Sequence, residues 1–329
     1  MPESLALLIL VLIAAVGFGI ANGFNDAANT IGTVIGTRTL SPRNAIIMAA
    51  FFNFAGAATG TKVVITIAGI VTVTPLPMSI IFSGVVSVII WTTVATRFGM
   101  PISLTHGLVA GLVGAGIATS GSKVIDWGVL TKVISAVPIA PLLGLIGGFL
   151  VMVAILWLFH KSAPERVRRI FANAQILSAA FLAYSHGKND GQMPIALISM
   201  ALVAYYGYSE LYIPFWAIAA SAASISFGTL IGGWRVIQTL GLKMTTLRPV
   251  HGFAANLSAA AVIETASHLG IPVSTTHCVS TAIMGVGATR RLSAVRWGIA
   301  RNIVLTWVLT FPACGVLGWL IASLLKIAF

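Results

Sequence analysis

Two acidic residues stand out because each lies in a short polar segment flanked by long apolar sequence. Asp26 lies in residues 22–30, Asn-Gly-Phe-Asn-Asp-Ala-Ala-Asn-Thr, and Asp190 lies in residues 186–192, His-Gly-Lys-Asn-Asp-Gly-Gln. An ionisable group at membrane depth is costly and is therefore a functional candidate. Carboxylate and carboxamide oxygens suit small cations, and the weak helix formers Gly and Asn favour a broken helix that frees backbone carbonyls. The predicted cation ligands are Asn25, Asp26, Asn29, Asn189 and Asp190.

Two proline-led segments have the residue types to bind an oxyanion. Residues 99–106 read Gly-Met-Pro-Ile-Ser-Leu-Thr-His, and residues 270–277 read Gly-Ile-Pro-Val-Ser-Thr-Thr-His. Proline ends one helix, and the residues after it can begin the next, whose N-terminus has free N–H groups and favours negative charge. Ordinary N-capping is the alternative role for these hydroxyls. The predicted oxyanion ligands are Ser103, Thr105, Ser274, Thr275, Thr276 and Gln192.

Both kinds of segment occur twice, in the same order. The proline-led segments align at a shift of 171 residues, and the two Asn-Asp pairs align at a shift of 164. Two separate polar motifs in one order indicate an old duplication rather than chance similarity, and they argue against a mere packing motif at the Asn-Asp pairs. We divide the chain into a first half, residues 1–160, a basic connector, residues 161–172, and a second half, residues 173–329.

The composition defines the elements that must position these residues. Hydrophobic residues make up 58% of the 329 residues and charged residues 8%, which excludes a soluble globular protein, a disordered chain and a disulfide scaffold. We interpret residues 5–20 as a membrane helix rather than a signal peptide. A full span needs about 20 residues, so short apolar stretches such as 107–118 and 174–185 predict broken helices and re-entrant hairpins. The expected fold is an all-α polytopic membrane protein, an inverted-topology repeat with about 10–12 helical segments.

The basic residues predict the orientation of the two halves. The connector around 160–169 is the densest basic stretch, and cytoplasmic loops of membrane proteins collect Lys and Arg. With the connector in the cytoplasm, 14 of the 19 basic residues lie inside and four lie outside. Loops that are basic in one half correspond to loops nearly without charge in the other, so the repeats are inserted in opposite directions. Both termini are then expected outside the cell.

The same motifs are similar to those of the PiT inorganic phosphate transporter family. Residues 23–29 resemble its Asn-Asp signature, residues 186–192 resemble the second copy, and residues 272–277 match its Pro-x-Ser-Thr-Thr-His motif. The resemblance spans nearly the whole chain and implies an inverted-repeat symporter that moves phosphate with sodium or protons. Leu104 interrupts the first hydroxyl motif, and Lys188 stands where relatives have a small residue.

Charge supports coupled transport independently of this resemblance. Asp26 and Asp190 would repel a bound phosphate by several kcal/mol at low dielectric unless cations bridge the charges or protons neutralise them. We therefore predict import of inorganic phosphate by cation symport, with alternating access around a midplane site. Sodium is favoured over the proton because asparagines flank both carboxylates. The alternatives are a proton-coupled phosphate or sulfate permease and a passive anion channel, which would not need paired carboxylates.

Enzymatic functions are disfavoured. The sequence contains neither HExxH nor GxSxG, its six histidines are dispersed, and it has no Gly-rich nucleotide loop. We predict no catalytic residues and no cofactor apart from the transported sodium or proton. The expected partners are inorganic phosphate, a monovalent cation and the lipid bilayer of the plasma membrane. The net charge of +12 reflects topology, so no nucleic-acid partner is expected, and a homodimer is left open.

Overall fold

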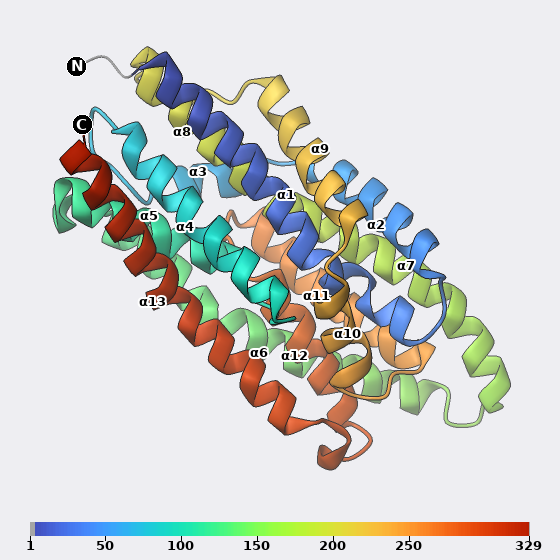
Figure 1. Cartoon of the computed structure of the whole chain (residues 1–329). Helices are drawn as coiled ribbons and strands as arrows, with labels where there is room; N and C mark the ends of the chain where they lie inside the picture. Colours follow the sequence, from blue (N-terminus) through green and yellow to red (C-terminus); the bar gives the residue numbers. More distant parts are fainter. Residues whose placement is uncertain (1–3, 329) are drawn as a thin grey trace.

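The computed structural model describes residues 4–328, which fold into α-helices joined by short turns (Figure 1). This confirms the expected all-α fold. The helices of the first half are α1 (Leu5–Gly36), α2 (Pro42–Ala57), α3 (Lys62–Ala68), α4 (Met78–Arg97), α5 (Leu104–Ser120) and α6 (Trp127–Leu158). Those of the second are α7 (Pro164–Asp190), α8 (Gln192–Tyr206), α9 (Phe215–Ile231), α10 (Trp234–Gln238), α11 (Pro249–His268), α12 (Thr275–Ala288) and α13 (Trp297–Ala328).

The element order recurs along the chain. α4 and α11 each have 20 residues, and α6 and α13 each have 32. α2 and α3 are bent by 74° at their junction, and α9 is bent by 66° against the helical segment Trp234–Lys243. In Figure 1, α1 runs away from the end of the molecule where α13 finishes, whereas α7 runs toward it from the connector at the opposite end.

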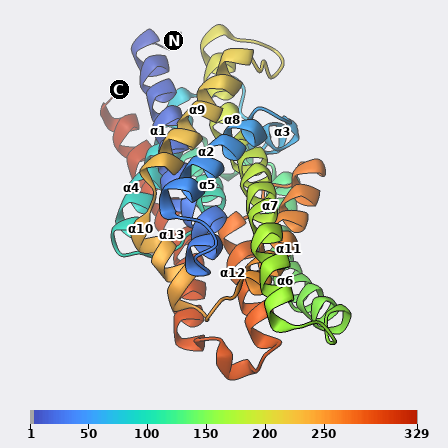
Figure 2. The same cartoon turned by 90° about the vertical axis from the view of Figure 1, so that its right-hand side faces the viewer.

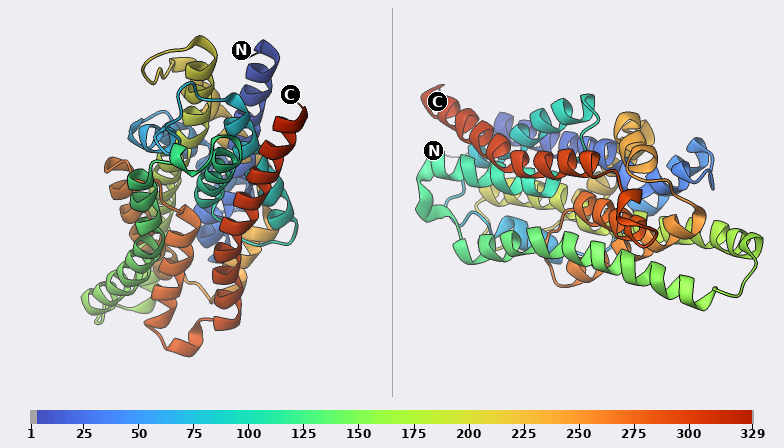
Figure 3. Two further views of the ribbon diagram at one scale, coloured as in Figure 1. Left: turned by 90° about the vertical axis from the view of Figure 1, so that its left-hand side faces the viewer. Right: turned by 90° about the horizontal axis from the view of Figure 1, so that it is seen from below.

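Several helices are suited to a lipid environment. Within residues 4–328, four helices are long and apolar enough to span a membrane, or up to six if each bent pair is one span. The 18-residue windows that qualify α6 and α13 are only 28% and 22% buried. Large apolar side chains such as Trp157 and Leu324 are exposed on them. Figures 2 and 3 show both long helices at the periphery, so their exposed apolar faces are positioned to contact lipid.

Helices of each half pack against helices of the other half. α6 packs against α11 and α12 of the second half, and α13 packs against α4 and α5 of the first. Gly144 and Gly148 allow the close approach of α6, because a Cβ atom at these positions would lie 2.6 and 2.5 Å from backbone oxygens of α12. α1 likewise packs on α9, and α7 on α2. This packing between the halves brings polar segments that are far apart in the sequence together at the centre.

Candidate ion and oxyanion site

The first Asn-Asp segment lies on an unbroken helix. α1 continues from Leu5 to Gly36 through residues 22–30, so the expected break at Asp26 is wrong. Spacings of three and four residues place Asn22, Asp26 and Asn29 along one side of the helix, and all three are buried. The second segment does end a helix, because α7 stops at Asp190 and α8 begins two residues later, after Gly191.

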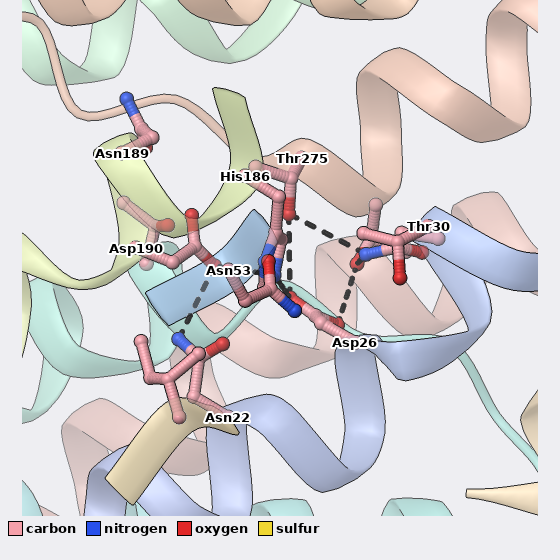
Figure 4. Close-up of polar contacts among 12 residues, drawn as sticks. Asn22, Asp26, Thr30, Asn53, His186, Asn189, Asp190 and Thr275 are labelled. Atoms are coloured by element: carbon pink, nitrogen blue, oxygen red, sulfur yellow. Dashed lines mark hydrogen bonds and ion pairs between the residues drawn. The ribbon is translucent and has the colours of Figure 1, made fainter. Parts of the chain in front are cut away.

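The two carboxylates come together around a histidine. The Nε2 atom of His186 lies 3.7 Å from Oδ2 of Asp26 and 3.5 Å from Oδ2 of Asp190. One candidate ligand atom from each of the three residues lies within 4.8 Å of the others, and all three residues are buried. Asn22 donates to Asp190 over 3.2 Å (Figure 4). Three such atoms, contributed by α1 and α7, are close enough to hold one small cation.

Neither His186 nor Asn22 was among the sequence-predicted ligands. His186 precedes Asp190 by four residues, and this helical spacing was the available signal. The orientation of His186 depends on Asn53 of α2. Asn53 donates from Nδ2 to Thr229 at 2.9 Å, and its Oδ1 lies 2.9 Å from Nδ1 of His186. The imidazole therefore donates from Nδ1, and its Nε2 atom is the one that faces the carboxylates.

The hydroxyls of the second proline-led segment bind the first carboxylate. Thr275 donates to Oδ2 of Asp26 at 3.3 Å, and Thr276 donates to Oδ1 at 3.0 Å. Asn29 donates to the same two hydroxyls, at 3.4 and 2.9 Å. Two predicted cation ligands and two predicted oxyanion ligands thus form one network at the start of α12.

The two proline-led segments meet. Thr105 at the start of α5 donates to the carbonyl of Val273 at 3.2 Å. The rings of His106 and His277 contact each other with centroids 4.8 Å apart. The two helix N-termini therefore lie side by side, which gives the site two positive dipole ends.

The serines of these segments act as N-caps. Ser103 accepts from the backbone N–H of His106, and Ser274 accepts from that of His277, both at 3.2 Å. Leu104, which replaces a hydroxyl residue in the first motif, is buried in the apolar core. The second segment therefore brings more hydroxyl groups to the centre than the first.

Two further predicted ligands, Gln192 and Asn189, have different partners. Gln192 accepts from the N–H groups of Val63 and Val64 at 2.6 and 3.2 Å, at the start of α3. The amide of Asn189 lies 2.9 Å from the hydroxyl of Ser267. Turned so that its oxygen accepts this bond, its nitrogen donates to Oδ1 of Asp190 at 3.3 Å. Asn189 thus adjoins the carboxylates, whereas Gln192 is engaged with α3.

Several buried acceptors of α1 lack a protein partner. Among residues 4–328, the amide oxygens of Asn22, Asn25 and Asn29 and the Nε2 atom of His186 have no protein hydrogen bond. Buried polar atoms are nearly always paired, so these unpaired acceptors, on the two helices that carry the carboxylates, are available to a ligand such as a hard cation.

Comparisons with known proteins identify the family of the chain. Residues 22–318 match the phosphate transporter family, and the chain belongs to that family. A "probable low-affinity inorganic phosphate transporter" of Rhizobium meliloti (strain 1021) is 42% identical over 96% of this chain and 96% of its own length. One of the same description from Bacillus subtilis (strain 168) is 37% identical over 99% of both chains.

The fold also matches a solved structure. The structure described as the sodium-dependent phosphate transporter superposes on this chain with a TM-score of 0.92 at 27% sequence identity. It covers 99% of this chain and 100% of its own. The family, the apolar helices and this match define an integral membrane protein that transports phosphate.

Proposed function

We propose that this chain imports inorganic phosphate together with sodium, and that Asp26, His186 and Asp190 bind the coupling cation. The orientation of His186 carries the proposal. Its Nε2 atom faces two buried carboxylates, and two carboxylates in one buried site repel each other unless a cation or a proton lies between them. The unpaired oxygens of Asn22, Asn25 and Asn29 support a metal cation, because hard cations take oxygen ligands.

Phosphate binds, in this proposal, where the starts of α5 and α12 meet. Helix N-termini favour oxyanions, and Thr275 and Thr276 supply hydroxyls there. These hydroxyls donate to Asp26 in the present structure, so a cation that neutralises Asp26 releases them for the anion. Cation binding therefore precedes phosphate binding. Protonated phosphate also donates to the amide and carboxylate oxygens, which sulfate cannot do.

Alternating access follows in this proposal from two halves inserted in opposite directions, residues 1–160 and 173–329, around a midplane site. The opposite directions of α1 and α7 and the equal lengths of α6 and α13 support this arrangement. We place the connector in the cytoplasm and both termini outside, in the plasma membrane, because most basic residues then lie inside.

Uptake of radiolabelled phosphate into proteoliposomes tests the function, with sodium and proton gradients imposed separately. A sodium gradient should drive accumulation above equilibrium at equal pH on both sides. Accumulation on a proton gradient without sodium would replace sodium with the proton as the coupling ion. Entry that only equilibrates phosphate under either gradient would contradict symport and indicate a channel.

A further inference from the structure

A cavity with threonine and arginine side chains in its lining lies next to the ion site, between α1, α4 and the junction of α9 with α10. Its volume is about 870 Å³, and its polar lining residues are Thr92, Thr93, Thr96, Arg97 and Arg235. Among the described residues that line it are two arginines and no acidic residue. Such a cavity concentrates anions, because clefts lined by one sign of charge focus the electric field.

The lining of the cavity contacts the helix segment that carries Asp26. Asn25, the residue before Asp26, donates to the hydroxyl of Thr96 at 2.6 Å. Thr92 is 1% exposed, and its hydroxyl has no protein partner among residues 4–328. An unpaired buried hydroxyl in a cavity with two arginines provides a donor that the protein itself does not use.

The same construction recurs in the other half of the molecule. The contact of Asn25 with Thr96 is repeated, at shifts of 164 and 171 residues, by the amide of Asn189 and the hydroxyl of Ser267. Around it, Thr239 donates to the carbonyl of Gly99 at 3.0 Å, and Thr66 donates to that of Gly270 at 2.6 Å.

A basic side chain also binds the end of the preceding helix in both places. Arg235 donates to the carbonyl of Arg97 at the end of α4, and Lys62 donates to that of His268 at the end of α11. The two regions are therefore built on one plan, and each adjoins one of the two Asn-Asp pairs.

Three of the positions at which the two regions differ change the local charge. Phe24, Thr93 and Arg97 border the cavity, and at the same shifts the other half has Lys188, Glu264 and His268. Lys188 forms an ion pair with Glu264, and Nε2 of His268 lies 3.2 Å from Nζ of Lys188 and 3.1 Å from Oε1 of Glu264.

In the second half, the space next to the Asn-Asp pair is therefore filled by paired charges. In the first half the arginines are exposed and the cavity is open. A free anion or an anionic headgroup can approach the second region only by displacing Glu264, whereas no acidic side chain among the described residues pairs with the arginines at the first.

We propose that the cavity at Arg97 and Arg235 is an oxyanion-binding vestibule, which holds a phosphate group beside the ion site. The ligand chemistry is a phosphate oxyanion, supplied either by free inorganic phosphate or by the headgroup of an anionic lipid. As a step on the transport path, the vestibule rests on the proposed function. As a binding site, it stands on its own charges and contacts.

A single thiol placed in the cavity tests the proposal without requiring transport. Thr93 is exposed and lines the cavity, and both native cysteines, Cys278 and Cys314, are buried. In nanodiscs of neutral lipid, the thiol of Thr93→Cys should react about tenfold faster with an anionic thiosulfonate than with a cationic one, by electrostatic focusing. Added inorganic phosphate should slow the reaction in a saturable way.

Matched variants assign the effect to the arginines. Arg97→Gln, which leaves the bond donated by Arg235 in place, and Arg97→Gln with Arg235→Gln should each remove the protection by phosphate and the preference for the anionic reagent. Arg235→Lys should keep both, because the charge remains. Arg301→Gln removes an exposed arginine of α13 outside the cavity lining and should leave labelling unchanged.

Nanodiscs with added anionic lipid distinguish free inorganic phosphate from a lipid headgroup as the ligand. Protection that appears with anionic lipid alone, and that phosphate does not increase, would assign the vestibule to a lipid headgroup. Labelling that neither phosphate nor anionic lipid slows, or protection that survives loss of both arginines, would overturn the proposal. Phosphate uptake by the same protein is measured separately, so sodium-driven uptake with unprotected labelling would refute the vestibule alone.

Discussion

The Nδ1 atom of His186 and the Oδ1 atom of Asn53 lie 2.9 Å apart, although 133 residues separate them in the chain. Asn53 also donates to Thr229, which fixes its oxygen as the acceptor. The bond therefore determines which nitrogen of His186 faces Asp26 and Asp190. A contact between α2 and α7 thus sets the chemistry of the proposed ion site.

Replacing Asn53 should weaken cation binding without removing a direct ligand. In Asn53→Leu, His186 loses the bond that orients it, and we expect the sodium concentration for half-maximal uptake to rise about tenfold or more, as when the partner of a metal-binding histidine is removed. The sodium dependence of phosphate uptake measures this. Asn44→Ala, at an exposed position of the same helix, is the control. An unchanged sodium dependence in Asn53→Leu would show that His186 needs no such orientation.

Each carboxylate should be necessary for coupling. Asp26→Asn and Asp190→Asn keep the side-chain shape but remove a charge from a buried site, so both should abolish sodium-driven uptake while the proteins still elute as folded species on size exclusion. Asp126→Asn is the control, because Asp126 caps α6 and asparagine caps equally well. Normal sodium-driven uptake by either site variant would remove that carboxylate from the coupling site.

Substitutions of two adjacent residues at the start of α12 should affect different properties, one stability and the other phosphate affinity. Ser274 accepts a capping bond, whereas Thr275 donates to Asp26. Ser274→Ala should lower stability by about 1 kcal/mol. Thr275→Val should lower phosphate affinity about tenfold, since a hydrogen bond to a charged group contributes about 1.5–3 kcal/mol. Thermal unfolding and phosphate binding to the purified variants separate these effects. Unchanged affinity in Thr275→Val would leave the helix N-termini as the phosphate site.

The ion pair of Lys188 with Glu264 should show strong coupling in stability. Both side chains are largely buried, at 11% and 19% exposure. Removing one partner leaves an unpaired buried charge, which costs about 3–5 kcal/mol, whereas removing both costs much less. Thermal unfolding of Glu264→Gln, Lys188→Met and the double variant forms a double-mutant cycle. Additive effects would show that the pair is not coupled.

The proposed membrane orientation predicts that the connector and the turn after α8 are accessible from opposite sides of the membrane. Lys161 lies in the connector and Ser209 lies in the turn after α8, and both are exposed. In intact cells, an impermeant thiol reagent should label Ser209→Cys and should label Lys161→Cys only after permeabilisation. The buried native cysteines give a low background. The reverse pattern would invert the topology.

The sequence predicts those parts of the site that depend on residue type and recurrence. The paired Asn-Asp segments and the paired proline-led segments repeat, so Asp26, Asp190 and the hydroxyls at 275 and 276 could be found without coordinates. Asn53 and Asn22 could not, because their roles arise from contacts between helices that are distant in sequence. The continuity of α1 was missed because Gly and Asn are weak helix formers. In an apolar environment, however, backbone hydrogen bonds are best satisfied within an unbroken helix.

The central claim is that sodium and phosphate cross the membrane together. The most direct test measures radiolabelled sodium and radiolabelled phosphate uptake in the same proteoliposomes, with equal pH on both sides. Symport predicts that external phosphate stimulates sodium uptake, that external sodium stimulates phosphate uptake, and that Asp190→Asn loses both effects. Phosphate uptake that proceeds at the same rate without sodium, with no phosphate-stimulated sodium flux, would contradict it.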